Sequence, residues 1–312
     1  MDVRDLLVLT LIILQTVLGI PGNFFLLSHH LLLYLTASRL RATDVIIKNL
    51  IVANVLVLFS SGLRHPLTFF GLFQDNDLVC KMVPYARGVG RGVSISTTCL
   101  LSVVQAFTIS PLSSRWAGLR EKAVRCILPC IALCWVLSML VNIVYPMYLS
   151  SVLSHKNDTS RKTFGKCSSV RHDPTSDFLY GALLSFPDVV FFVIMLWASG
   201  SMVCTLHRHR QRVRHLHRSS ASSTSSPESR ATRTILLLVS TFVCFNALSS
   251  IFYIAVSVFH NPDQFLLDFN TILTLCFPTL SPFLLLSREP KVSLLCSAWM
   301  RNIKSPIPVR NM

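Results

Sequence analysis

The chain has 312 residues, of which 52% are hydrophobic and only 14% are charged, and its mean hydropathy is +0.56. Soluble domains usually carry about 25% charged residues, so this composition excludes a pair of soluble domains and indicates one membrane-embedded bundle. The net charge of +15 would also suit nucleic-acid binding, but the positions of the charges along the chain argue against that interpretation.

Seven apolar runs predict seven membrane-spanning helices, because each run can cross a hydrocarbon core of about 30 Å at about 1.5 Å per residue. The first run has no charged residue from Leu6 to Ser38 and no basic leader, so we expect a helix and not a cleaved signal peptide. We predict one all-α membrane domain over residues 1–312, with a cytoplasmic tail at 287–312. The expected helices cover residues 6–33, 45–70, 80–108, 123–148, 177–206, 231–259 and 266–286.

Lysine and arginine are concentrated in alternate connections between these helices. The segments near the first, third and fifth connections, together with the tail, hold nineteen basic and four acidic residues, whereas the rest of the chain holds ten of each. The whole positive excess therefore lies on one side of the bundle, which is the positive-inside pattern of membrane proteins. This pattern predicts an extracellular N-terminus and a lipid bilayer as the partner, with no nucleic acid.

Two features mark the long outer loop at residues 149–175. Of the ten cysteines, only Cys80 and Cys167 lie on the outer, oxidising side of the predicted topology. We predict a disulfide between them, which would anchor this loop to the third helix and stabilise the fold by closing a long loop; the alternative is two free thiols. The loop also carries the chain's single N-x-S/T sequon, which predicts N-glycosylation at Asn157.

Arg87 and Arg91 are four residues apart on one face of the third helix. A cation at the centre of a bilayer costs about 2.5–3.5 kcal/mol on insertion scales, so both side chains should face a polar interior or an acidic partner. Asp188 in the fifth helix and Asp268 in the seventh are the candidate partners. Two interpretations remain open: a pocket for polar or anionic small molecules, or a salt bridge that locks the third helix.

The sequence carries no enzymatic signature. There is no nucleophile elbow, no H-E-x-x-H and no phosphate-binding loop. Cys126, Cys130 and Cys134 share one helix face, but no histidines converge on them, so they indicate helix packing and not a metal site. We therefore expect a protein that is not an enzyme and that has no cofactor and no metal.

Several long strings resemble the vomeronasal type-1 receptors, a family of G protein-coupled pheromone receptors. They are GRGVSISTTCLLSVVQAFTISP at 90–111, CWVLSMLVNIVYPM at 134–147, LLLVSTFVCFNALSSI at 236–251 and CFPTLSPFLLLSREPKV at 276–292. The resemblance spans essentially the whole chain. It implies a multi-pass receptor of the plasma membrane that binds small organic cues, anionic ones among them, and activates an inhibitory-class (Gi/Go) heterotrimeric G protein.

Two alternatives accompany this interpretation. A bitter-taste-type chemoreceptor would share the architecture and the mode of signalling. A small-solute membrane transporter would be a different class of protein, and it is disfavoured because the chain lacks helix pseudo-repeats and a relay of intramembrane acids.

The resemblance also suggests which residues would meet the two partners. The candidate ligand contacts lie in the outer halves of the third, fifth, sixth and seventh helices: Met82, Tyr85, Arg87, Arg91, Asp188, Asn246, Tyr253 and Asp268. The candidate G-protein contacts lie in the inner loops: Arg115, Arg120, Lys122, Arg208, Arg210 and Arg212. These basic residues could instead serve only to set the topology.

Overall fold

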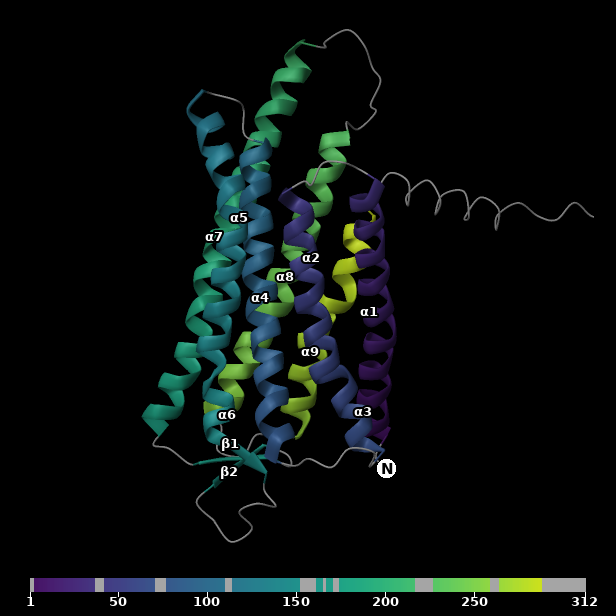
Figure 1. The fold of residues 1–312 in the computed structure, drawn as a ribbon, viewed down its shortest axis with the longest axis vertical. Helices are drawn as coiled ribbons and strands as arrows, with labels where there is room; N and C mark the ends of the chain where they lie inside the picture. Colours follow the sequence, from purple (N-terminus) through teal and green to yellow (C-terminus); the bar gives the residue numbers. More distant parts are fainter. Residues whose placement is uncertain are drawn as a thin grey trace, which may run out of the picture.

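The computed structural model describes residues 3–36, 42–70, 77–109, 114–151, 161–164, 167–170, 174–216, 227–258 and 264–287. Within these residues the chain forms a bundle of long helices with a small sheet at one end (Figure 1). The helices are α1 (Val3–Thr36), α2 (Ala42–Val57), α3 (Arg64–Phe69), α4 (Asp77–Ile109), α5 (Ser114–Asn142), α6 (Val144–Tyr148), α7 (Pro174–Leu216), α8 (Pro227–Val258) and α9 (Gln264–Leu286).

These helices build seven membrane-crossing rods, as the sequence predicts. A π-helical stretch, Leu58–Leu63, joins α2 to α3 in one rod, and α5 continues through α6 in another. Five stretches of described residues are long and apolar enough to cross a membrane: Val3–Leu32, Thr43–Leu67, Cys126–Tyr148, Gly181–Thr205 and Phe265–Leu286. A shorter apolar stretch, Val239–Phe252, lies in α8.

The helix α7 is longer than the sequence analysis expected. Its predicted end was residue 206, but the helix continues to Leu216 through a basic run that contains neither glycine nor proline. Figure 1 shows α7 extending beyond its neighbours at the end of the bundle that lies opposite the sheet. This projection carries arginines away from the membrane-spanning part of the helix.

The long outer loop folds into a three-stranded antiparallel sheet, which the sequence did not predict. The strands are β1 (Leu149–Ser151), β2 (Arg161–Phe164) and β3 (Cys167–Val170), and β3 lies in the middle. Figure 1 shows this sheet at the end of the bundle where α1 begins, which is the extracellular end. Asn157 and the tail at 288–312 lie outside the described residues.

The sheet is tied to the bundle by the predicted disulfide. Cys80, in the first turn of α4, bonds to Cys167 at the start of β3, with a Cα–Cα distance of 5.7 Å. Both cysteines are buried, and the Nη2 atom of Arg64 in α3 lies 3.6 Å from the Cys167 sulfur. The disulfide therefore ties β3 to the extracellular end of α4, and Arg64 brings α3 to the same point.

The distribution of side chains is that of a protein surrounded by lipid. Large apolar side chains point outward, Leu128, Phe186 and Trp197 among them, and each exposes more than 60% of its surface. By contrast, the buried face of α4 carries small hydroxyl residues: Ser94, Ser96, Thr97, Thr98 and Ser102. Most of these hydroxyls donate to carbonyl groups of the preceding helical turn, so they satisfy themselves and let neighbouring helices approach closely.

Two glycines bring α5 against α4. A Cβ atom added to Gly88 would collide with the Asn142 side chain, and one added to Gly92 would lie 2.8 Å from the Ser138 Oγ atom. A larger residue at either position would force the facing α5 side chain, or the helix itself, to move. Glycine here serves close packing, the role that small residues play at helix interfaces in membranes.

Asn23 joins α1 to α9 at a proline-induced defect. Pro282 has no N–H group, so the carbonyl of Pro278, one turn earlier, loses its helical donor. The Asn23 Nδ2 atom donates to that carbonyl at 2.9 Å, and also to the Gly19 carbonyl at 2.8 Å. Asn23 is fully buried, so an otherwise unsatisfied backbone group within the bilayer is paired by a neighbouring helix.

We predict that Asn23→Leu lowers the thermal stability of the purified protein in detergent. The substitution keeps the branched shape of the side chain, although leucine is larger, and it leaves the Pro278 carbonyl without a donor, which costs about 1–3 kcal/mol. Phe24→Leu is the matched control, because Phe24 is the next residue and is exposed on the outer face of α1. Equal melting temperatures for the two variants would contradict this assignment.

Candidate functional site

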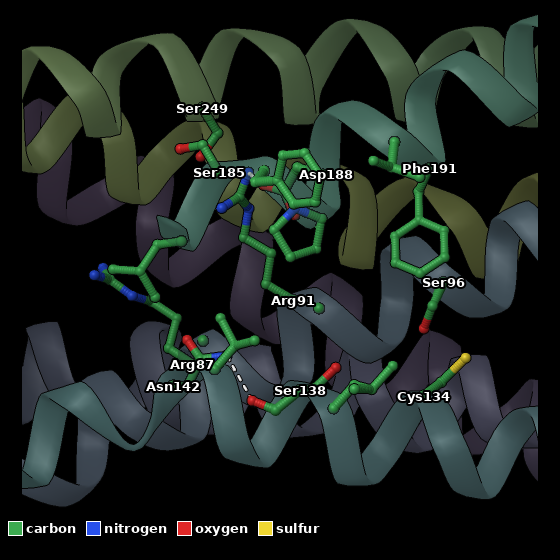
Figure 2. A pocket seen from close by; sticks show the side chains of 18 of the residues that line it. Arg87, Arg91, Ser96, Cys134, Ser138, Asn142, Ser185, Asp188, Phe191 and Ser249 are labelled. Atoms are coloured by element: carbon green, nitrogen blue, oxygen red, sulfur yellow. Dashed lines mark hydrogen bonds and ion pairs between the residues drawn. The ribbon is translucent and has the colours of Figure 1, made fainter. Parts of the chain in front are cut away.

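A cavity of about 300 Å³ lies inside the bundle, between α4, α5 and α7, with α8 and α9 closing its far side. Figure 2 shows its polar side chains converging from these helices. On α4 the lining residues run from Arg87 to Ser96, which places the cavity roughly 15–30 Å below the start of that helix at 1.5 Å per residue. The cavity is therefore buried within the membrane-spanning part of the protein.

Arg91 pairs with Asp188 on α7. The Arg91 Nη2 atom lies 2.8 Å from Asp188 Oδ2, and the two side chains expose only 19% and 8% of their surface. Ser250 of α8 completes the cluster: its hydroxyl accepts a hydrogen bond from Arg91 Nη2 at 2.5 Å and donates to Asp188 Oδ2 at 3.2 Å. Three helices thus meet at a buried charge pair whose net charge is zero.

Arg87 has a different environment, although it lies only one turn from Arg91. Figure 2 shows its side chain directed away from the Arg91–Asp188 pair. It is half-buried and lines the cavity, and among the described residues no acid pairs with it. The sequence left two interpretations of these arginines open. The salt bridge applies to Arg91, whereas Arg87 faces the cavity, as the pocket interpretation requires.

Asp268 does not pair with either arginine. Its Oδ1 atom lies 3.3 Å from His65 Nε2, which belongs to α3, and Asp268 is not among the cavity-lining residues. The reason is depth, because α9 begins at Gln264 and Asp268 follows one turn later at the extracellular end. The sequence analysis did not pair Asp268 with His65.

Three of the remaining ligand candidates, Met82, Tyr85 and Asn246, do not line the cavity. Met82 is exposed on α4, and Tyr85 packs against the cluster formed by Ala53, Val89 and Val93. Asn246 is buried in α8 and uses its side-chain amide to donate to the Phe242 carbonyl, while its backbone carbonyl accepts a long hydrogen bond of 3.5 Å from Arg91. Tyr253 belongs to α8, but its side chain lies outside the described part of the structure.

The sequence analysis missed the wall that α5 contributes. Cys134, Ser138 and Asn142 of α5 line the cavity opposite Arg87 and Arg91 (Figure 2). Their spacing of four residues places small and polar side chains on one face of an otherwise apolar helix, and this pattern could have identified them. From α7, α8 and α9 the cavity also receives Ser185, Phe191, Ser249, Asn270 and Thr274.

The cytoplasmic candidates lie at the opposite end of the bundle. Arg115, Arg120 and Lys122 belong to the first turns of α5, which begins at Ser114. The second group, Arg208, Arg210 and Arg212, belongs to the last turns of α7. Arg208 is exposed, and the other five side chains lie outside the described part of the structure.

Comparison with known proteins agrees with this architecture. Residues 8–298 match the model of the vomeronasal organ pheromone receptor family. The chain belongs to the vomeronasal type-1 receptor family. It is therefore a multi-pass membrane receptor and not an enzyme, and its family differs from both of the alternatives that the sequence left open.

Individual relatives cover nearly the full chain. Human vomeronasal type-1 receptor 4 is 48% identical over 93% of this chain and 97% of its own length. Human vomeronasal type-1 receptor 3 is 41% identical over 98% of this chain and 99% of its own length. A zebrafish (Danio rerio) protein, olfactory receptor class A-like protein 1, is 30% identical over 91% of this chain and 90% of its own length.

We predict that Asp188→Ala strongly destabilises the receptor, because it leaves the Arg91 guanidinium buried without its counter-charge. Breaking a buried pair from one side costs about 3–5 kcal/mol. The double variant Arg91→Met/Asp188→Leu, which removes both charges, should recover most of the loss in melting temperature. A double variant that is at least as unstable as Asp188→Ala would show that the pair is not the source of the stability.

Proposed function

We propose that this receptor binds a small organic ligand in the cavity between α4, α5 and α7 and responds by activating an inhibitory-class (Gi/Go) heterotrimeric G protein. The observation that carries the proposal is the half-buried Arg87, which lines this cavity and has no acidic partner among the described residues. Membership of the vomeronasal type-1 receptor family supports a chemosensory role. The volume of about 300 Å³ suits a small molecule, because ligand cavities are about 300–1,000 Å³.

Arg87 and Arg91 would have different roles in binding. The charge of Arg91 is compensated by Asp188, so it attracts an anion weakly. Arg87 keeps its full charge in a partly desolvated site, where a hydrogen bond to a charged group contributes about 1.5–3 kcal/mol. The ligand best matched to the cavity therefore carries one anionic or strongly accepting group near Arg87, on a largely apolar body.

Signalling would follow from the position of α7. This helix forms one wall of the cavity through Ser185 and Phe191, and it is tied to α4 by the Arg91–Asp188 pair. Its far end projects at the cytoplasmic side (Figure 1). A ligand that prefers one placement of α7 would shift the population of receptor states, and the basic inner end of the helix would present that change to the G protein.

Arg87→Ala should weaken the response to anionic agonists and spare neutral ones. A panel of small organic acids and their neutral analogues, applied to cells that report inhibition of cyclic AMP synthesis, measures this difference. For anionic agonists we expect a roughly 10- to 100-fold rise in the half-maximal concentration, from the loss of one charge-assisted hydrogen bond. Lys81→Ala is the control, because Lys81 pairs with Asp77 at 2.6 Å and does not line the cavity.

Equal half-maximal concentrations in the Arg87→Ala and Lys81→Ala variants, for every acid in the panel, would contradict the proposed role of Arg87 in binding anions.

Pertussis toxin provides a separate test of the G-protein class. A ligand response that survives the toxin undiminished would exclude Gi/Go coupling, whatever the outcome at Arg87.

Neutralising the inner end of α7 tests the cytoplasmic contact. In a triple variant with glutamine at 208, 210 and 212 we expect a lower maximal response at unchanged agonist potency, because coupling is weakened while the cavity is untouched. Surface labelling of an N-terminal epitope shows whether the topology is retained. A full maximal response at normal surface expression would mean that these arginines act only in setting the topology.

A further inference from the structure

The cavity has a side opening that faces the membrane between α5 and α7. Leu137 of α5 and Phe186 and Val190 of α7 all line the cavity. The same three side chains expose 47%, 67% and 40% of their surface, so the bundle does not enclose them. A residue that belongs to both the cavity wall and the outer surface marks a place where the wall is incomplete.

The packing of the helices explains why the opening lies here. Gly88 and Gly92 hold α5 against α4, and the Arg91–Asp188 pair holds α7 against α4. Between α5 and α7 themselves the described residues make few contacts. Both helices are thus anchored to a third, and the gap between them is left open.

The depth of the opening determines what it meets. Leu137 lies in the apolar span Cys126–Tyr148, and Phe186 and Val190 lie in the span Gly181–Thr205. Leu137 is roughly 16 Å from the extracellular end of its span, at 1.5 Å per residue. Phe186 and Val190 are roughly 8 and 14 Å from the extracellular end of theirs. For a hydrocarbon core of about 30 Å the opening therefore extends from near the bilayer midplane, at Leu137, into the outer leaflet, where it contacts acyl chains and not water.

We propose that the ligands of this receptor reach the cavity laterally from the outer leaflet, through the opening framed by Leu137, Phe186 and Val190. The proposal rests on the ligand role of the cavity proposed above and specifies its ligand class. The molecule dissolves in the bilayer, enters with its apolar body between the three side chains, and carries one acceptor or anionic group. That group meets Arg87, Ser138 and Asn142 on the inner side of the opening.

The extracellular end of the receptor is consistent with this route. The disulfide between Cys80 and Cys167 draws the three-stranded sheet onto the end of α4. None of the described residues of that sheet lines the cavity. The sheet and the cavity are therefore at different depths, and the apolar opening lies in the membrane below the sheet.

A membrane-dissolved photolabel tests the opening without any agonist or G protein. The purified full-length receptor is placed in phospholipid nanodiscs with 3-(trifluoromethyl)-3-(m-iodophenyl)diazirine, irradiated, digested and mapped by mass spectrometry. Ser96 is the reporter, because it lines the cavity but is only 2% exposed. Leu133 is the positive control, because it is exposed to lipid and does not line the cavity. We expect adducts at both positions.

Closing the opening should abolish labelling at Ser96 and leave labelling elsewhere. The blocking variant is Leu137→Trp/Val190→Trp. Its matched control is Leu133→Trp/Val193→Trp, which adds the same two indoles on the same helices about one turn away, at lipid-facing positions outside the cavity lining. Leu137→Ala, which widens the opening, should increase the Ser96 adduct and remains informative if the blocking variant does not fold.

The proposal is overturned if Ser96 stays unlabelled in the wild-type receptor while other lipid-facing positions react, or if the blocking variant labels as well as its control. Stronger labelling of Ser96 by a water-soluble, charged diazirine would also overturn it, as would a phospholipid chain retained in the opening. A receptor that signals but shows none of the expected labelling refutes the lateral route alone. A receptor that labels as expected but never signals refutes the proposed function alone.

Discussion

The ion pair between Arg91 and Asp188 is the constraint on which the arrangement of this bundle depends. An unpaired guanidinium within hydrocarbon is too costly to leave on the surface of α4, so the face that carries it must be covered. Asp188 supplies the counter-charge from α7, and Ser250 supplies a further polar contact from α8. The orientation of α4 about its own axis, and the positions of two neighbouring helices, follow from satisfying that one cation.

With that orientation set, the remaining polar residues of α4 acquire their partners. Ser94 donates to Asn54 Oδ1 on α2 at 3.1 Å, and Asn54 in turn donates to Ser281 Oγ on α9 at 2.8 Å. Lipid offers no hydrophobic gain for helix association, so such interhelical hydrogen bonds and the close approach at Gly88 and Gly92 hold the bundle together. The cavity lies beside α4, between α5 and α7. Among the described residues, neither an interhelical hydrogen bond nor a close glycine contact joins those two helices.

Much of the fold was predictable, because the bilayer restricts a chain to a few solutions. Helix lengths follow from hydrocarbon thickness and orientation follows from basic residues, so apolar runs and charges were enough for the seven rods.

The short strands were not predictable, since strands of three or four residues show no periodicity. The pairing of Asp268 with His65 was not predictable either. Neighbouring turns of a helix lie at different depths, and only the packed structure shows which acid is level with which nitrogen-bearing side chain. The α5 wall was overlooked for a related reason: Ser138 and Asn142 resemble ordinary packing residues until the opposite side of the cavity is known.

The contrast between Arg87 and Arg91 shows how one helix face can serve both stability and recognition. The two residues are chemically identical and only one turn apart, yet Arg91 has an acid within 2.8 Å and Arg87 has none among the described residues. Adding an acid beside Arg87 would stabilise the bundle, but it would also fill the site with an internal ligand. The uncompensated cation lies half-buried in a cavity, where a polar wall from α5 faces it. If the cavity binds ligand as proposed, this arrangement makes the site selective, because a ligand would gain from Arg87 only by bringing a negative charge to that depth.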